Sequence, residues 1–257
     1  PQRDTPEAWL VEGGMGQVAQ RLSQELAPCL RLRAPVTAIE QTASGARVCH
    51  GAGGVLDARA VVVAIPPPLR LAIAFTPPLP PDWTALLQRS PMGTMVKVLA
   101  LYPEAFWREE GCNGLGIGDL PLLSLTVDSS PPGGRPGLLA SFIAGEPAAR
   151  WRNLSPQARE EGVLADLAAY WGPRAAQPSQ LILHDWTGEP WTLGAFTNVL
   201  IPGAWTSYGP IWRQPHGRVF WAGTEASPRW PGYFEGAMEA GLAAAEQVGA
   251  CLEGHGG

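Results

Sequence analysis

A single lysine is the most distinctive reactive residue of this sequence. The 257 residues contain 18 lysines and arginines together, and only Lys97 is a lysine. A lysine ammonium is compact and its pKa falls readily on burial, whereas arginine carries a bulky, permanently charged guanidinium. Lys97 could therefore place a small cation where a guanidinium does not fit. The alternative is an ordinary residue on the surface of a strand.

A glycine-rich helix start near the C-terminus could hold negative charge. Gly232 and Tyr233 open a helical pattern that runs to about Val248. The N-terminus of a helix has unsatisfied N–H groups and about half a positive charge, so it stabilises an anion placed against it. The small residues Gly236 and Ala237 permit close backbone approach. Tight packing on a sheet would explain the glycines, but not an aromatic residue in the first turn.

A second glycine-rich segment matches a dinucleotide-binding pattern. Residues 14–19 read G-x-G-x-x-A, between an apolar segment at 8–12 and a helical pattern at 17–26. In a dinucleotide site an acidic residue follows about 20 residues later and binds the ribose. Glu40, at the end of a later predicted strand, lies beyond that spacing. The segment is either such a site or a helix start placed for packing.

The elements that must position these residues alternate between helix and strand. Apolar patterns predict strands at 36–39, 46–50 and 60–65, the last one fully buried because the whole run is apolar. From residue 95 the sequence changes character: Val96 and Val98 alternate with Lys97 and Leu99, as in a sheet strand, and further strands are predicted at 122–127, 137–143 and 181–186. Helices are predicted at 83–88 and 157–171, and a buried strand at 218–222 precedes the last helix. The pattern is α/β with a second sheet inserted in the middle.

Composition and charge exclude several classes of function. The net charge is −5 with no run of like charge, which argues against nucleic acid and an anionic membrane surface as partners. No apolar stretch approaches the ~20 residues of a membrane helix. The four cysteines and four histidines are scattered, which argues against a metal site and favours a reduced, cytoplasmic protein. The first residue is not methionine, so the natural N-terminus is expected upstream.

Five blocks, in order and with sensible spacing, resemble the flavin-containing monoamine oxidase family. They are GGMGQ at 13–17, AIPP at 64–67, PMGTMVK at 91–97, AGTE at 222–225 and GYFEGA at 232–237. The resemblance implies a Rossmann-type FAD-binding domain interleaved with an α+β substrate domain built on an antiparallel sheet. It assigns residues 1–87 and 189–257 to the FAD-binding domain and 88–188 to the substrate-binding domain. The family's own G-x-G-x-x-G unit precedes these blocks, so we expect this chain to be the C-terminal portion.

The resemblance gives roles to individual residues. Lys97 falls on the family's lysine, which holds a water against flavin N5. Phe196 and Tyr233 match two aromatic rings that flank the amine, and Gly232 would lie beneath the flavin pyrimidine ring. Ala195 stands where animal monoamine oxidases attach FAD through a cysteine, which implies non-covalent FAD. The complete set implied to bind the cofactor is Val36, Ala64, Pro66, Trp186, Ala195, Gly223, Thr224, Glu225, Gly232, Tyr233 and Phe234.

Three of these positions leave alternatives open. Trp186 would pack near the flavin, or serve structural packing equally well. Phe196 replaces the more common tyrosine but keeps an aromatic wall for an apolar amine, unless it is ordinary core. Glu225 follows a strand end near the expected pyrophosphate, where a bare carboxylate would repel phosphate. We therefore expect Glu225 to accept hydrogen bonds from backbone or from a ribose hydroxyl.

The resulting expectation is an enzyme that oxidises a small-molecule amine to an imine with molecular oxygen as acceptor, giving hydrogen peroxide. Monoamine, polyamine and amino acid remain open as substrates. No arginine is obviously placed for a carboxylate, and the Trp- and Leu-rich composition favours an apolar amine. One alternative is a non-catalytic fragment or subunit without flavin, which pairs with the missing N-terminal portion or forms a homodimer. The other is a stand-alone dinucleotide-binding module that uses Gly14 and Gly16.

Overall fold

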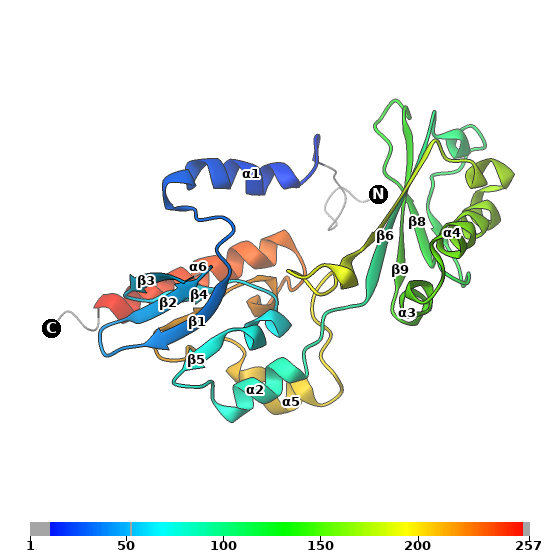
Figure 1. The fold of residues 1–257 in the computed structure, drawn as a ribbon. Helices are drawn as coiled ribbons and strands as arrows, with labels where there is room; N and C mark the ends of the chain where they lie inside the picture. The colour runs from blue at the N-terminus through cyan, green and yellow to red at the C-terminus, as the bar shows by residue number, and fades with distance from the viewer. Residues whose placement is uncertain (1–10, 52, 254–257) are drawn as a thin grey trace.

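Two lobes with separate hydrophobic cores make up the molecule (Figure 1). The computed structural model describes residues 11–51 and 53–253. The sheet lobe, as we call it, runs from β6 to β10 and lies in the middle of the chain. The terminal lobe contains the described elements before β6 and those after β10. Among the described residues no helix is both long and apolar enough to cross a membrane.

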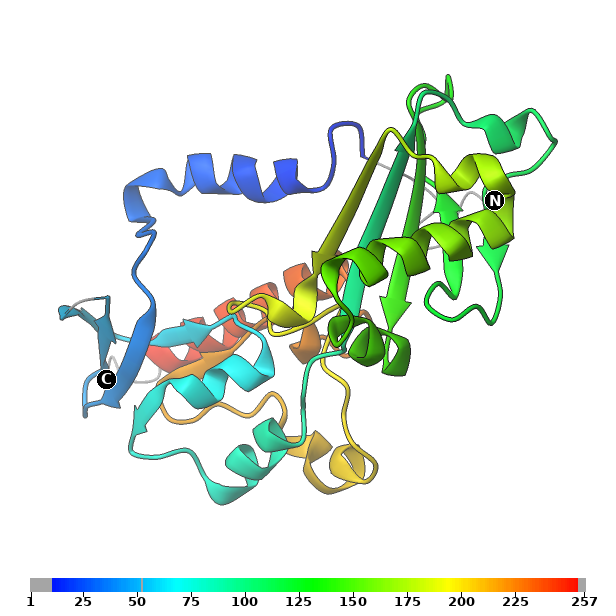
Figure 2. The same ribbon diagram turned by 45° about the vertical axis from the view of Figure 1, so that its right-hand side comes forward.

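The sheet lobe is built on an antiparallel sheet with the strand order β10-β6-β9-β8-β7. Two helices, α3 and α4, cover one face of this sheet (Figure 2). The elements are β6 (Met95–Tyr102), β7 (Gly116–Ile117), β8 (Leu125–Asp128), β9 (Gly137–Ala144), α3 (Glu146–Arg152), α4 (Pro156–Trp171) and β10 (Gln180–Asp185). The alternation predicted from residue 95 is confirmed, because Val96 and Val98 are fully buried while Lys97 and Leu99 are half-buried on the opposite face.

Helix α4 is positioned by local chemistry at its N-terminus and by a buried carboxylate. The Ser155 side chain accepts a hydrogen bond from the N–H of Ala158, which caps the helix. Asp166, in the middle of α4, is 4 % exposed. It accepts hydrogen bonds of 2.8 Å from the backbone N–H groups of Leu122 and Leu123. The helix is thereby fixed to the loop that precedes β8.

The terminal lobe contains two small sheets and several helices. A four-stranded sheet has the order β3-β2-β1-β5, and β4 pairs with β11 in parallel. Its strands and helices are α1 (Gly16–Glu25), β1 (Val36–Gln41), β2 (Ala46–His50), β3 (Gly54–Ala58), β4 (Val61–Val63), β5 (Ala74–Thr76), α2 (Pro81–Gln88), α5 (Ala204–Tyr208), β11 (Val219–Trp221) and α6 (Phe234–Glu253). Short 3-10 helices in the two lobes are η1 (Ala27–Cys29), η2 (Pro67–Ala72), η3 (Phe106–Arg108), η4 (Pro173–Ala176), η5 (Trp186–Gly188), η6 (Gly209–Ile211) and η7 (Thr224–Ala226).

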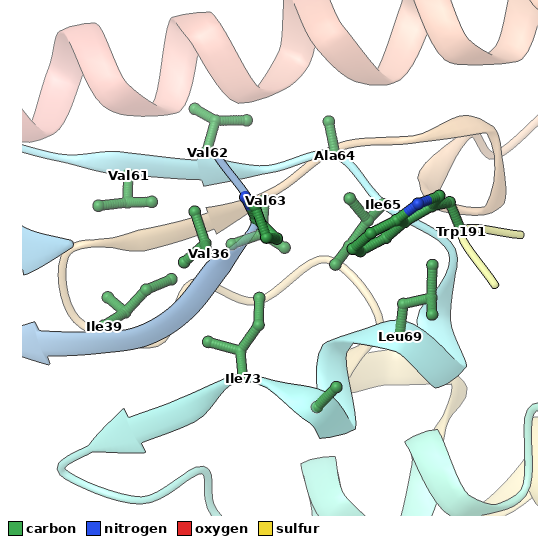
Figure 3. A pocket seen from close by; sticks show the side chains of 12 residues that line it. Val36, Ile39, Val61, Val62, Val63, Ala64, Ile65, Leu69, Ile73 and Trp191 are labelled. Carbon is green, nitrogen blue, oxygen red and sulfur yellow. The ribbon is translucent and has the colours of Figure 1, made fainter. Parts of the chain in front are cut away.

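The prediction of a fully buried strand at 60–65 was wrong. Only Val61–Val63 form a strand, and the side chain of Val62 is 43 % exposed. An apolar run is typical of a parallel strand that is covered on both faces. Strand β4 has one neighbouring strand, β11, and Val62 remains 43 % exposed on the face that points towards α6 in Figure 3.

The dinucleotide pattern at 14–19 has no strand before it in the described residues. Residues 11–15 form turns, and positions 8–10 of the predicted strand lie outside the described residues. The pattern leads into α1, which has no buried residue and stands away from the sheets in Figures 1 and 2. The packing of helix against sheet that a dinucleotide site requires is therefore not formed by these described residues.

Two linking segments connect the lobes and pair with each other. The N–H of Val199 donates to the carbonyl of Pro91 at 2.7 Å, and the N–H of Ile201 donates to the carbonyl of Arg89 at 3.2 Å. An isolated bridge joins Met92 and Asn198. The chain thus leaves the terminal lobe and returns to it at neighbouring points.

Candidate active site

A cavity of about 870 Å³ lies between the sheet lobe and the terminal lobe. Its lining comes from β6, β10, the returning linker, η7 and the start of α6. In both Figures 1 and 2 the end of β10 and the short helix η5 lie beside the N-terminal end of α6. Small-molecule sites have volumes of roughly 300–1,000 Å³ and mostly apolar walls. The size and position of this cavity suit such a site.

Lys97 extends from the face of β6 that the helices leave uncovered. Its partners directly across the sheet are His184 on β10 and Phe142 on β9. The ammonium nitrogen lies 4.4 Å from the centroid of the Phe142 ring, an attractive contact between a cation and the face of an aromatic ring. Burial lowers the pKa of Lys97 below its usual value. The side chain therefore releases a proton more readily than an exposed lysine does.

Phe142 also connects Lys97 to the predicted aromatic wall. The ring centroids of Phe142 and Phe196 are 5.2 Å apart and the rings are inclined by 75°. Such edge-to-face contacts fix the orientation of both rings. Phe196 is 60 % exposed, so most of its ring is accessible at the cavity. The ring of Phe142 thus contacts both the ammonium of Lys97 and the ring of Phe196.

A tight crossing of the two linkers fixes the segment that carries Phe196. The N–H of Ala195 donates to the carbonyl of Gly93 at 3.0 Å, and the N–H of Gly93 donates to the carbonyl of Thr197 at 3.1 Å. A Cβ atom at Gly93 would lie 2.3 Å from the carbonyl oxygen of Ala195, so the crossing requires glycine. Because the same segment continues into β6, this crossing positions Phe196 and Lys97 relative to each other.

The N-terminal end of α6 contributes to the opposite wall. Gly232, Phe234 and Ala237 line the cavity, and Gly232 has a φ of +89°, a conformation that favours glycine. Tyr233 is not among the lining residues. Its ring is 43 % exposed and packs edge-on against Trp230, with 6.0 Å between the ring centroids. The structure therefore places the first aromatic of the predicted pair at the cavity and the second beside it.

Glu225 brings an almost buried carboxylate to the cavity, and Arg70 supplies the counter-charge. Glu225 is 8 % exposed and its Oε1 accepts a hydrogen bond of 3.4 Å from the hydroxyl of Thr197. Arg70 is fully buried and donates to the carbonyl groups of Ile65 and Ala222 at 3.3 and 3.1 Å. Burial lowers the pKa of Arg70 to about 10, and the charge of Glu225 opposes that shift. The charges of Arg70 and Glu225 thus attract each other within this wall.

His184 and Trp186 form the edge of the cavity at the end of β10. The two rings are nearly perpendicular, with 4.4 Å between their centroids. The Nε2 atom of His184 lies 3.4 Å from Oε1 of Glu189, and both side chains are 42 % exposed. An imidazole in this position can donate a hydrogen bond when neutral and adds a positive charge when protonated.

A second, apolar cavity of about 350 Å³ lies within the terminal lobe (Figure 3). Val36 and Ile39 from β1 face Val63 and Ile73 across it, and Trp191 reaches towards Ile65. Two further residues, Ala64 and Ile65, line both cavities and connect them. Val36 therefore lies at a site adjoining the first cavity rather than in it.

The first cavity brings together most of the residues singled out in the sequence. They are Ala64, Pro66, Lys97, Trp186, Ala195, Phe196, Gly223, Thr224, Glu225, Gly232 and Phe234. Sequence reasoning missed His184, Phe142 and Arg70. Leu99 also lines the cavity, and its spacing of two residues from Lys97 could have identified it. The positions of His184 and Phe142 depend on strand register, which no spacing along the chain reveals.

Comparison with known proteins is consistent with this geometry. Residues 3–249 match the family described as flavin containing amine oxidoreductase. The chain is 40 % identical to an L-amino acid dehydrogenase of Synechocystis sp., over 96 % of this chain and 52 % of that protein. It is 36 % identical to the flavin-containing amine oxidase A of Bos taurus, over 92 % of this chain and 45 % of that protein.

Solved structures show the same likeness in three dimensions. Putrescine oxidase bound to putrescine gives a TM-score of 0.89 at 32 % identity, and cyclohexylamine oxidase from Brevibacterium oxydans gives 0.88 at 36 %. Each match covers 93 % of this chain and 53 % of the solved chain, so this chain spans about half the length of its relatives. The predicted fold class, a partial Rossmann-type FAD-binding part interleaved with a substrate part on an antiparallel sheet, is confirmed. The chain belongs to the family of flavin-containing amine oxidoreductases.

Proposed function

We propose that this chain carries the flavin and substrate sites of an enzyme that oxidises an amine to an imine, with oxygen as acceptor and hydrogen peroxide as product. The observation that carries the proposal is the single cavity at which Lys97, Phe196 and the start of α6 meet. When bound, FAD accepts the hydride that leaves the amine carbon and passes two electrons to oxygen. Water then adds to the released imine and displaces ammonia or an amine.

The residues of the cavity fit the ring system of FAD. The lining is mostly apolar, as a planar aromatic ring system requires, with Ile65 and Met92 among its members. Gly223 and Gly232 have φ values of +98° and +89° and present backbone without a Cβ atom. The N-terminal end of α6 offers N–H groups to an electron-rich ring edge. We assign residues up to 87 and from 189 onward to the FAD-binding part, and residues 88–188 to the substrate part.

The chain's own side chains would perform separate tasks. Lys97 is a compact cation that holds a water and stabilises negative charge at the cavity. Phe196 excludes water and orients the amine against the cofactor. Trp186 would pack beside the flavin, and Thr224 and Glu225 would face its sugar chain. Tyr233 is proposed as the second ring that flanks the amine, and Val36 as a contact on the adenine side.

We propose that FAD is held without a covalent bond, because Ala195 occupies the position of the linking cysteine. Acid precipitation of the FAD-loaded protein should then release all flavin into the supernatant. Flavin colour that stays with the washed protein pellet would contradict non-covalent binding.

We further propose that the site is completed by the rest of the fold, which supplies the glycine-rich turn for the pyrophosphate. The support is that the chain spans about half of each relative, and that Val62, Met238 and Leu242 expose apolar side chains (43 %, 60 % and 67 %) on the terminal lobe. The 257-residue chain alone should bind FAD weakly or not at all. Tight, stoichiometric FAD binding in calorimetry would contradict this and favour residues 14–17 as the anchor. The alternative is that a second copy of the chain covers these side chains. The molecular mass of the chain in solution distinguishes a homodimer from a monomer.

The decisive experiment replaces Lys97 in the complete, FAD-loaded protein. Lys97→Met keeps the volume of the stem and removes the charge, so turnover should fall while flavin content changes little. Reoxidation by oxygen should slow most, by roughly a hundred- to thousandfold, the typical effect of losing one electrostatic donor in such a site. Lys97→Arg should also be impaired, because the guanidinium is larger. Stopped-flow reoxidation within about twofold of wild type for both variants would refute the role.

A further inference from the structure

The sheet face at the cavity is basic and contains no acid. Lys97 and Leu99 of β6, Ile182 and His184 of β10, and Phe142 of β9 lie on this face. The nearby acid of β10, Asp185, points to the opposite face, where it pairs with Arg152 at 2.8 Å. An incoming ligand therefore meets two basic groups on the sheet side of the cavity.

These two basic side chains are direct neighbours, and of the two only His184 has an acidic partner among the described residues. Lys97 and His184 are opposite each other in the antiparallel register, a placement that brings Cβ atoms to about 5 Å. Among the described residues, no carboxylate lies within ion-pair distance of Lys97, and its ammonium lies over the face of the Phe142 ring. His184 has one acidic neighbour, Glu189, at 3.4 Å.

The acid on the opposite wall does not compensate them. The charge of Glu225 acts on the buried guanidinium of Arg70, where it opposes the lowering of the arginine pKa by burial. Oε1 of Glu225 also accepts a hydrogen bond from Thr197. The ammonium of Lys97 is thus a cation without an acidic partner on the sheet side of the cavity, and an anionic group of a ligand can neutralise it.

We propose that the substrate is an amine that also carries a carboxylate, as an amino acid does, and that His184 with Lys97 receives this carboxylate. The inference rests on the proposed function and names the substrate class of the same site. The apolar residues Leu99 and Ile182, one pair further along the sheet, would contact the side chain of the substrate. Lys97 provides the cation that was sought among the arginines of the sequence, and the imidazole of His184 lies beside it as a hydrogen-bond donor.

A diamine is the alternative substrate, and the residues around His184 distinguish it from an amino acid. Its second ammonium would need an acid, and Glu189 is the candidate beside His184. His184 lines the cavity whereas Glu189 does not, so a ligand meets the imidazole first. This order favours the carboxylate over a second ammonium.

The first experiment compares L-phenylalanine with phenethylamine in the complete, FAD-loaded protein. The two substrates differ only in the carboxylate. We expect kcat/KM to favour phenylalanine by roughly ten- to hundredfold, the range for one hydrogen bond to a charged group. His184→Gln should reduce this preference by a similar factor, mainly through KM for phenylalanine. His216→Gln, a matched change in the terminal lobe, should leave the preference unchanged.

The second experiment needs no flavin and no turnover. The imidazole signals of the four histidines are followed by NMR in the chain itself, and His184→Gln identifies the signal of His184. 3-Phenylpropanoate, which keeps the carboxylate, should shift the His184 signal in a saturable way. Phenethylamine at the same concentration should not.

The outcomes separate this inference from the proposed function. Oxidation of phenethylamine at least as efficient as that of phenylalanine leaves the amine oxidase standing and overturns the carboxylate assignment. Preference for putrescine, lost in Glu189→Gln, would establish the diamine instead. If neither the aromatic substrates nor putrescine are oxidised, the proposed function fails, and the NMR titration alone decides whether His184 binds a carboxylate. An unshifted His184 signal overturns the assignment in every case.

Discussion

The helices that cover the sheet lobe bury their large apolar residues more completely than α1 and α6 of the terminal lobe do. In the sheet lobe Trp107, Leu139 and Leu167 are fully buried, because α3 and α4 close one face of the sheet. In the terminal lobe Met238 and Leu242 expose 60 % and 67 % of their surfaces along α6, and α1 buries no residue at all. The comparison teaches that an apolar helix pattern predicts burial only if another element packs against the apolar face.

The largest expected effect comes from replacing one leucine by alanine in each lobe and comparing the two variants. Leu139→Ala in β9 removes a fully buried side chain and should cost about 2–5 kcal/mol of unfolding free energy. Leu242→Ala on α6 should stay within about 0.5 kcal/mol in the isolated chain, because its side chain is already exposed. Urea unfolding of both variants measures the difference. Equal costs would show that the exposed face of α6 is covered in solution.

A smaller but still large effect is expected at the buried arginine of the terminal lobe. Arg70→Met leaves Glu225 without its counter-charge and two carbonyl groups without donors, which should cost about 3 kcal/mol. Adding Glu225→Gln should recover part of that loss, since the uncompensated charge is removed. Thermal or urea unfolding of the single and double variants gives the coupling. Simple addition of the two costs would show that these charges do not interact.

The smallest effect is expected at a tyrosine of the sheet-lobe core. The hydroxyl of Tyr102 donates to the carbonyl of Ala175 at 2.8 Å, and burial raises the pKa of Tyr102. Tyr102→Phe should therefore cost about 1 kcal/mol at neutral pH. The folded state binds the phenolic proton more tightly than the unfolded state does, so wild-type stability should fall as the pH rises above about 10. Tyr102→Phe should lack that part of the alkaline loss. Parallel pH profiles for the two proteins would contradict this.

The sequence alone identified the elements whose signals are local. The alternation of Val96 and Val98 with Lys97 predicted both the strand β6 and the face that carries the lysine. The scarcity of lysine and the five ordered blocks drew attention to Lys97, Phe196 and the start of α6. The predicted burial of Val62 failed, because burial depends on a neighbour that the pattern does not contain.

Other features could not be predicted because they depend on how distant strands pair. His184 and Phe142 become neighbours of Lys97 only through the register of β10 and β9 against β6. Arg70 resembles any other arginine in the sequence until Ala222, from the other end of the chain, accepts its hydrogen bond. Strands β3 and β5, which were not predicted, are short additions at the edges of the four-stranded sheet.

The paired linkers have a consequence for how this architecture can change. The chain leaves the terminal lobe near Arg89 and Pro91 and returns at Val199 and Ile201, and these residues are joined by hydrogen bonds. The sheet lobe is therefore an inserted segment whose two ends lie side by side. Exchange of the whole sheet lobe between relatives, with both linkers included, would preserve the distance between the two chain ends at which the terminal lobe is joined. The exchanged segment would include the contact between Gly93 and Ala195. The new substrate-binding residues would therefore keep their position relative to the terminal lobe.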